Sequence, residues 1–305
     1  MNPRGAGRAS GSALLALLFA NGAGAGAHGA TTAVAAPQVL LLGTGYPRPD
    51  PAHAGPATAV IVAGKVFLVD AGRGVTLRWS ATEIPLKALY AVFLTHLHSD
   101  HIAGLPDLFN TSWIFGRYEP LRLYGPAGTR EMADAMLAFF AVDIPIRRDL
   151  TEKHPGAGAT VETHVVDEGL AYEDDDVSVT AFRVDHGPVK DAFGYRFEAS
   201  GRTIVISGDT RPNDNLVRHA KGADVLVQEA YLPEHFDRVD TPEVAARLKS
   251  YHTSAEEAGQ LAQAAGVKLL VLTHLIPAGA EATFLERARR YFKGKIVVGR
   301  DLMRF

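Results

Sequence analysis

Four side chains that can bind a metal ion lie close together in the run Thr95-His96-Leu97-His98-Ser99-Asp100-His101. His96 and His98 stand two residues apart at the end of an apolar run, so in a strand both side chains leave the backbone on one side. Asp100 and His101 follow in the turn into the next segment. Neutral imidazole and carboxylate suit zinc, and two histidines joined by a third from elsewhere, with a position left for water, are typical of a catalytic site.

A lone histidine would more often be a hydrogen-bonded or surface residue than a metal ligand. That interpretation fails for the whole run, because four polar or ionisable groups at a strand end would otherwise leave unsatisfied groups at the edge of an apolar core. The chain has no cysteine, which excludes thiolate ligands and disulfide bonds. The run therefore predicts a metal site built from histidine and carboxylate.

Regular elements must position these residues, and the hydrophobic pattern predicts both strands and helices. Short runs rich in β-branched residues predict strands at 39–42, 57–62, 66–70, 88–95, 177–185, 203–207, 224–228, 268–273 and 295–298. Amphipathic segments predict helices near 102–115, 129–141, 213–221, 254–265 and 281–292. Ser254 and Glu257 have the spacing of a capping box at the start of the fourth helix. Strands and helices mixed in this way predict a layered α/β fold.

Length, composition and the first residues bound the class of protein. With 305 residues, 47% of them hydrophobic, the chain can bury a full core, and a net charge of −3 gives no general attraction to nucleic acid.

The first residues have the pattern of an export signal. Arg4 and Arg8 precede an apolar stretch at 13–20 that is short for a membrane span, and small residues follow at 25–27. We expect a signal peptide at 1–27, a linker at 28–37 and one domain at 38–305. We expect this signal peptide to be cleaved, which is favoured over an uncleaved anchor. The mature protein would then have no stable membrane insertion and would be periplasmic or secreted.

The motif His96-Leu97-His98-Ser99-Asp100-His101 resembles the hallmark His-x-His-x-Asp-His of the metallo-β-lactamase superfamily. The resemblance extends over 38–276 and implies a four-layer αββα sandwich, the metallo-β-lactamase fold, for a hydrolase domain at 38–305. Asp70, at the end of a predicted strand and before Gly72, matches a residue that supports the metal histidines in relatives. Further ligands are matched by His186, Asp209 and His274, which fall at or just beyond the ends of predicted strands, where sites collect in open α/β sheets.

The resemblance implies a site for two zinc ions, with other divalent metals such as manganese as alternatives. One ion would be held by His96, His98 and His186, the other by Asp100, His101 and His274, and Asp209 would bridge the two. Without a metal, Asp209 would be a turn residue before Pro212.

Within the superfamily the chain is similar to the ribonuclease Z branch. The similarity rests on Gly208-Asp209-Thr210-Arg211-Pro212, Phe193-Gly194-Tyr195 after His186, Gln228-Glu229-Ala230 and His252-Thr253-Ser254. In that branch the residues matched by Glu229 and His252 orient and protonate the leaving oxygen. The resemblance implies that a metal-bridging hydroxide, held also by Asp100, attacks phosphorus or a carbonyl carbon. On their own, a glutamate at a strand end and a histidine at a helix start would more often be solvated or capping residues.

Two departures from that branch argue against transfer RNA as the substrate. Only 22 residues separate His186 from Asp209, too few for the basic arm that grips tRNA in those enzymes. The export signal and the negative charge also do not suit a cytosolic nucleic acid. We expect a small-molecule ester or phosphodiester substrate, and the family resemblance allows a homodimer.

Several further residues could line a substrate pocket. Aromatic residues, which at such spacings are more often core, could form a partly apolar rim: Trp113, Phe115, Tyr118, Phe139, Phe140 and Tyr231. The segment 231–250, with His235, is either a lid or a surface helix pair, and His53 could reach the mouth of the site.

Three functions follow from these features. The leading hypothesis is a secreted zinc-dependent hydrolase of phosphodiester or related ester bonds, similar to ribonuclease Z. The alternative is a β-lactam or lactone hydrolase, because export and the same metal site also suit amide and lactone opening. The third is a metal-binding protein without catalysis, for which an unbroken ligand set is weak support.

Overall fold

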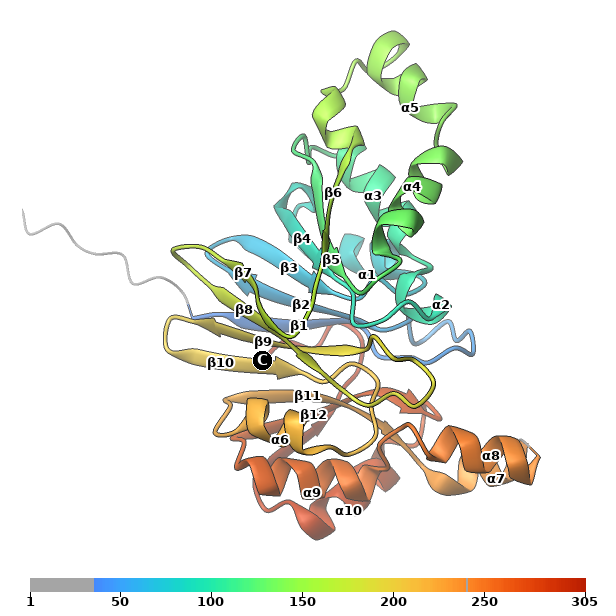
Figure 1. The fold of residues 1–305 in the computed structure, drawn as a ribbon, viewed down its shortest axis with the longest axis vertical. Helices are drawn as coiled ribbons and strands as arrows, with labels where there is room; N and C mark the ends of the chain where they lie inside the picture. The colour runs from blue at the N-terminus through green and yellow to red at the C-terminus, as the bar shows by residue number, and fades with distance from the viewer. Residues whose placement is uncertain (1–35, 240) are drawn as a thin grey trace, which may run out of the picture. The chain divides into compact units, whose positions relative to one another are not determined.

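The computed structural model describes residues 36–239 and 241–305, so the expected signal peptide and most of the expected linker lie outside the described residues. The described residues form two β-sheets, which are drawn in Figure 1. One sheet has six strands and the other has seven. The six-stranded sheet consists, in spatial order, of β1 (Gln38–Gly43), β2 (Ala57–Val62), β3 (Lys65–Val69), β4 (Leu89–Phe93), β5 (Leu121–Gly125) and β6 (Val161–Val165). The seven-stranded sheet consists, in reverse spatial order, of β7 (Gly169–Glu173), β8 (Ser178–Arg183), β9 (Phe193–Ala199), β10 (Arg202–Ile206), β11 (Val225–Tyr231), β12 (Leu269–Ile276) and β13 (Lys295–Val298).

Each sheet is mixed. Strands β3 to β6 run parallel to one another, as do β10 to β13, while β1–β2, β2–β3, β7–β8, β8–β9 and β9–β10 are antiparallel pairs. Parallel neighbours carry their carboxyl ends to the same edge of a sheet. The residues that follow β10 and those at the ends of β11 and β12 therefore meet at one edge.

The inner strands are largely apolar on both faces, because each sheet has a layer on either side. In β1, Val39 and Leu41 belong to the core between the sheets, whereas Leu40 and Leu42 belong to the core under the helices. Aromatic rings join the sheets across the central core, with Phe93 and Phe197 5.8 Å apart between ring centroids. The alternation of faces along β1 is the period of two that a strand imposes.

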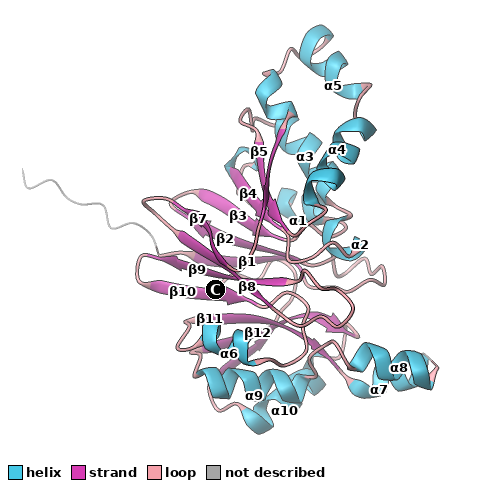
Figure 2. Ribbon diagram, in the orientation of Figure 1, coloured by secondary structure: helices cyan, strands magenta, loops and turns pink. Residues whose placement is uncertain are grey.

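Helices cover the outer faces of both sheets (Figure 2). The helices are α1 (Val75–Ser80), α2 (Ser99–Ile102), α3 (Leu105–Ile114), α4 (Thr129–Phe139), α5 (Asp143–Pro145), α6 (Asp214–Ala220), α7 (Pro233–Val239), α8 (Pro242–Lys249), α9 (Ala255–Ala265) and α10 (Glu281–Tyr291). Trp79, Phe109 and Met136 from α1, α3 and α4 pack on the first sheet, and Leu261 and Phe284 from α9 and α10 on the second. Two sheets flanked by helices confirm the predicted αββα layers.

The structure differs from the sequence prediction in several boundaries. The helix expected near 102–115 is α3, which begins at Leu105 because Pro106 favours the first turn of a helix, and the turn expected before it contains the short helix α2. Strands β5, β6, β7 and β9 were not predicted; β6 and β7 lie at sheet edges and are only partly buried, which weakens their hydrophobic pattern. The segment 231–250 contains the helix pair α7 and α8.

No helix among the described residues is long and apolar enough to cross a membrane.

Candidate metal centre

The predicted ligands come from both sheets. His96 and His98 follow β4, and Asp100 and His101 lie in α2. The second sheet contributes residues after β8 and β10 and one within β12: His186, Asp209 and His274. His274 lies at an irregularity between β11 and β12 and has a φ of 46°, a left-handed conformation that breaks the alternation of the strand.

All seven predicted ligands converge in two neighbouring groups. Ligand atoms of His96, His98, His186 and Asp209 lie within 4.8 Å of one another, as do those of Asp100, His101 and His274. Within the first group, Nδ1 of His98 lies 3.3 Å from Nε2 of His186. Within the second, Nε2 of His274 lies 3.3 Å from a carboxylate oxygen of Asp100. The division into two groups matches the division that the family resemblance implied.

One oxygen of Asp209 faces both groups. Its Oδ2 lies 3.3 Å from Nε2 of His101 and 3.4 Å from Nε2 of His274. The same atom lies 3.9 Å from Nε2 of His186 and 4.0 Å from Nε2 of His96. A carboxylate in this position is placed to bridge two cations.

The hydrogen bonds of the histidines fit a metal site. Nδ1 of His96, His101 and His186 faces the Thr95 hydroxyl at 3.0 Å, the Asp70 carboxylate at 2.8 Å and the Tyr251 carbonyl at 3.1 Å. Each of these oxygens can accept from Nδ1, which leaves the Nε2 lone pair directed at the cluster. The Nε2 atoms of His96 and His101 are buried and make no hydrogen bond among the described residues. Buried lone pairs without a donor are what divalent cations would satisfy.

Asp70 joins β3 to the metal run. Besides His101, its carboxylate accepts the Thr95 backbone N–H at 2.8 Å and the Thr95 hydroxyl. Asp70 has a φ of 60°, a conformation that costs energy for a residue other than glycine. Two residues later, a Cβ on Gly72 would lie 2.6 Å from the Asp100 carbonyl oxygen, so the chains approach too closely for a side chain. The predicted support of the metal histidines by Asp70 is therefore visible as direct contacts.

The carboxylates of the cluster raise the pKa values of two of its histidines. Burial opposes a charge on His101, but the carboxylates of Asp209 and Asp70 outweigh it and raise its pKa well above the ordinary value. Burial also opposes a charge on His274, yet Asp209 and Asp100 raise the pKa of His274 to about 9. By contrast, burial lowers the pKa of His186 to about 4. Protons on His101 and His274 thus balance the carboxylates where metal ions would otherwise do so.

Glu229 and His252 form a buried pair beside the cluster. Nδ1 of His252 lies 2.8 Å from Oε2 of Glu229, and Oε1 of Glu229 accepts the Thr210 N–H at 2.7 Å. Burial and the nearby Asp209 raise the pKa of Glu229 well above its ordinary value, and burial lowers the pKa of His252 to about 4. Glu229 also lies near Asp209 and His274. Unlike the predicted ligands, both of its carboxylate oxygens have partners outside the cluster, in Thr210 and His252.

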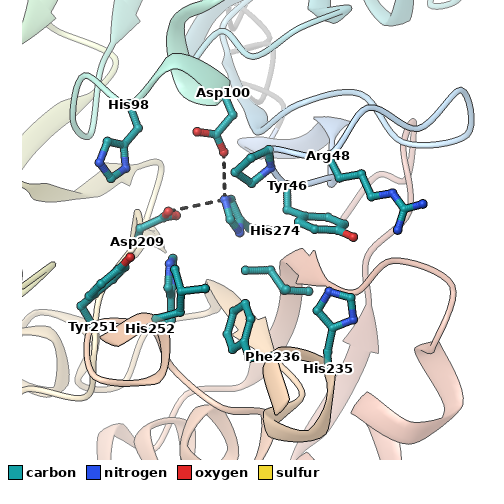
Figure 3. Close-up of a pocket in the computed structure, with 13 residues that line it drawn as sticks. Tyr46, Arg48, His98, Asp100, Asp209, His235, Phe236, Tyr251, His252 and His274 are labelled. Carbon is teal, nitrogen blue, oxygen red and sulfur yellow. Dashed lines mark hydrogen bonds and ion pairs between the residues drawn. The ribbon is translucent and has the colours of Figure 1, made fainter. Parts of the chain in front are cut away.

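A cavity of about 400 Å³ opens over the cluster (Figure 3). His98, Asp100, Asp209, His252 and His274 line its floor. The walls are largely apolar and come from the loop after β1, from the helix pair α7–α8, from the segment before α9 and from the end of β12: Tyr46, Pro47, Arg48, His235, Phe236, Leu248, Tyr251 and Ile276. Arg48 is exposed and is the one lysine or arginine in this lining.

The aromatic rim expected from sequence is wrong. Trp113 is fully buried under the first sheet and donates to the Pro155 carbonyl, and Tyr231 lies in the core below the pocket. None of the six expected rim residues lines the cavity. Five of them belong to the segment from α3 to α4, which covers the outer face of the first sheet. His53 does not reach the mouth either, since its ring faces the Thr44 hydroxyl at 3.1 Å. Of the expected wall residues, only His235 lines the cavity.

The actual wall residues Tyr46, Arg48, Phe236 and Tyr251 were not identified from sequence. A usable signal was the segment Gly43-Thr44-Gly45, which marks a turn after an apolar strand and precedes Tyr46 directly. Phe236 and Leu248 lie in the helix pair, whose sequence gives no indication of which face meets the site.

Comparisons with known proteins give a consistent result. Residues 65–275 match the sequence family described as Beta-lactamase superfamily domain. The chain is 44% identical over 281 residues to a ribonuclease Z of Mycobacterium sp. (strain KMS), covering 88% of this chain and 95% of that relative.

Two solved structures have a similar fold. The metallo-beta-lactamase fold protein YhfI from Bacillus subtilis has a TM-score of 0.69 at 22% identity, covering 88% of this chain and 98% of that one. The human tRNase Z, short form, has a TM-score of 0.66 at 24% identity, with the same coverage of 88% and 98%.

Proposed function

The chain belongs to the β-lactamase superfamily and, within it, to the ribonuclease Z family, and on that premise we propose that it is a phosphodiester hydrolase that uses two zinc ions. The observation that carries the proposal is the seven-ligand cluster with the Glu229–His252 pair beside it. Bound divalent cations would supply an activated water and polarise the phosphoryl oxygens.

The side chains of this protein would hold the cations and transfer the proton to the leaving group. Asp209, between the two ligand groups, holds them at a fixed separation. His252 faces Glu229 through Nδ1, which leaves Nε2 for the pocket. As the leaving oxygen takes the proton from Nε2, the proton shared with Glu229 moves to Nδ1, so charge does not build up on a buried imidazole. This division gives the fully buried Glu229 a role in proton transfer.

The shape of the cavity favours a compact substrate. A volume of about 400 Å³ lies within the range for small-molecule sites, roughly 300–1,000 Å³. Tyr46, Phe236 and Tyr251 offer rings against which a nucleobase or aryl group can pack. We therefore propose a phosphodiester with an aromatic substituent, cleaved next to that substituent.

A second candidate is a ribonuclease that acts on RNA. It is favoured by the curated relative named ribonuclease Z, which aligns over 95% of its length with this chain. The short segment between His186 and Asp209 and the negative charge argue against a tRNA substrate. A β-lactam hydrolase is not favoured, because the Glu229–His252 pair and the ribonuclease Z relatives both point to phosphodiesters.

We also propose that the protein is exported. Arg4 and Arg8, the apolar stretch and the small residues that follow support this, although they lie outside the described residues. Fusion of residues 1–36 to a reporter active only outside the cytoplasm tests the proposal, and a reporter that stays inactive would refute it.

Metal content and a substrate panel test the catalytic proposal together. We expect roughly two zinc ions per chain and turnover of bis(p-nitrophenyl) phosphate. A cyclic nucleotide, a precursor tRNA and a chromogenic cephalosporin complete the panel. Asp209→Ala should lose metal and activity, whereas Asp175→Ala, a matched change in an exposed turn, should lose neither. Metal-loaded protein that cleaves no phosphodiester in the panel would rule the proposal out.

A further inference from the structure

One carboxylate near the end of the chain holds both ends of the loop that forms a wall of the pocket. Oδ1 of Asp301 accepts the Thr44 backbone N–H at 3.0 Å and the Thr44 hydroxyl at 2.8 Å. Oδ2 of Asp301 accepts the Ala54 backbone N–H at 2.8 Å and Nε of Arg78 at 2.6 Å. Asp301 is thus bonded to both ends of the segment 44–54 and to α1.

The Asp301 side chain is buried and lies outside the lining of the pocket. Its side chain is 6% exposed, and it does not line the cavity over the metal cluster. Charged hydrogen bonds of this kind are stronger than neutral ones, because a full charge takes part. Asp301 therefore acts on the pocket only through the loop.

The loop contains no helix or strand, and a few further hydrogen bonds define its shape. The Gly45 N–H donates to the Ala54 carbonyl at 2.8 Å, Arg78 donates to the Pro51 carbonyl at 2.8 Å, and the Thr44 hydroxyl lies 3.1 Å from Nδ1 of His53. At the tip, Asp50 accepts the Ala52 and His53 N–H groups at 2.8 and 3.2 Å. Its two ends approach so closely that a Cβ on Gly45 would lie 2.9 Å from the Ala54 oxygen. Because Arg78 and the Thr44 hydroxyl are themselves bonded to Asp301, this carboxylate joins the ends of the loop to α1, while the bonds of Gly45 and Asp50 are independent of it.

Tyr46 and Arg48 are the pocket residues whose positions depend on this loop. Figure 3 shows both on the same side of the pocket, above His235 and Phe236. The Tyr46 ring meets the His235 ring edge to face, at 6.1 Å between centroids, and packs against the cluster that contains Phe236. Displacement of the loop would carry both Tyr46 and Arg48 away from the helix pair and open this wall.

We propose that Asp301 is a positioning residue that fixes the loop 44–54, so that Tyr46 and Arg48 form a substrate-binding wall for the retained aromatic group of a phosphodiester. The proposal rests on the phosphodiesterase function proposed above. Thr44 also accepts the Leu275 N–H through its carbonyl at 3.0 Å, next to His274, so the test must separate loop position from metal binding.

Two substrates that differ only in the retained group provide the test. Bis(p-nitrophenyl) phosphate retains an aryl group, and methyl p-nitrophenyl phosphate retains a methyl group. For Asp301→Ala we expect KM to rise roughly tenfold for the diaryl ester, with kcat within about twofold and zinc content unchanged. KM for the methyl ester should stay at the wild-type value, because the methyl group does not reach Tyr46.

Control variants sharpen the result. Tyr46→Ala should reproduce the effect, and the double variant should be no worse than either single one, since both changes remove the same wall. Asp175→Ala should leave both substrates unaffected. An unchanged KM for the diaryl ester would overturn the proposal, as would equal losses of kcat for both substrates together with loss of zinc.

Amide hydrogen exchange separates this proposal from the proposed function. In Asp301→Ala, exchange should accelerate at the amides of 44–54 and stay unchanged in α9, because the loop loses its bonds to Asp301 and α9 makes none of the bonds that Asp301 holds. If the wild-type protein cleaves no phosphodiester, the proposed function fails, and unchanged exchange in the loop would then refute the positioning role independently.

Discussion

At the scale of single residues, the oxygen that faces Nδ1 distinguishes the predicted histidine ligands from His252. Oxygens of Thr95, Asp70 and Tyr251 face Nδ1 of three rings and orient their Nε2 atoms toward the cluster. His252 differs, because the carboxylate that faces it belongs to a buried glutamate with a raised pKa. A ring held by such a partner is suited to transfer a proton rather than to bind a metal ion.

The role of His252 leads to a prediction about leaving groups. For His252→Ala we expect kcat to fall by about 10²–10⁴-fold with a dinucleotide, whose leaving alkoxide needs a proton. With bis(p-nitrophenyl) phosphate the loss should be much smaller, because nitrophenolate departs without protonation. Steady-state kinetics on both substrates, at measured zinc content, checks this. Equal losses on both substrates would contradict proton donation by His252.

At the scale of elements, the start of α9 connects helix stability to the site. The Ser254 hydroxyl accepts the Glu257 N–H at 3.3 Å, and the Glu257 carboxylate accepts the Ser254 N–H at 2.8 Å, which is the capping box predicted from sequence. His252 stands two residues before this cap, so the same bonds that start the helix fix the direction of the chain at His252.

The cap supports a prediction that combines stability with activity. Ser254→Ala should lower the free energy of unfolding by about 1 kcal/mol and also lower kcat, because the segment that carries His252 loses its anchor. Thr241→Ala removes a similar cap from α8 without touching that segment and should affect stability only. Chemical denaturation and kinetics of the two variants provide the check. A normal kcat in Ser254→Ala would mean that the cap does not position His252.

At the scale of the whole molecule, the site exists only where the two sheets meet. The run 96–101 follows a strand of the first sheet, while His186, Asp209 and His274 belong to the second. Metal binding at such a site links the two sheets and should stabilise the folded state. Metal binding should also displace a proton from His274, because Asp209 and Asp100 raise the pKa of His274 to about 9 despite its burial.

Proton displacement predicts how zinc affinity depends on pH. A pKa of about 9 means that His274 is protonated at neutral pH when no metal is bound. Against the effect of burial, Asp209 and Asp70 shift the pKa of His101 in the same direction. Zinc affinity should therefore rise with pH through the neutral range, by up to roughly tenfold per pH unit for each displaced proton. Calorimetric titration in buffers of different ionisation enthalpy measures the number of protons released. An affinity independent of pH between 6 and 8 would contradict this assignment, since about one proton or more must leave in that range.

The sequence determined the layered α/β class and the metal run, because hydrophobic alternation and ligand spacing are local properties of the chain. Contributions from distant segments, such as His186, Asp209 and His274, could be named only through family resemblance. Tertiary structure alone decided which aromatic residues face the pocket: Trp113 lies under the first sheet, and Tyr46 and Phe236 form walls. The role inferred for Asp301 also depends on tertiary structure, since its bonds reach residues more than 200 positions away. Such contacts depend on how elements pack in space, and the spacing of residues along one segment carries no record of that packing.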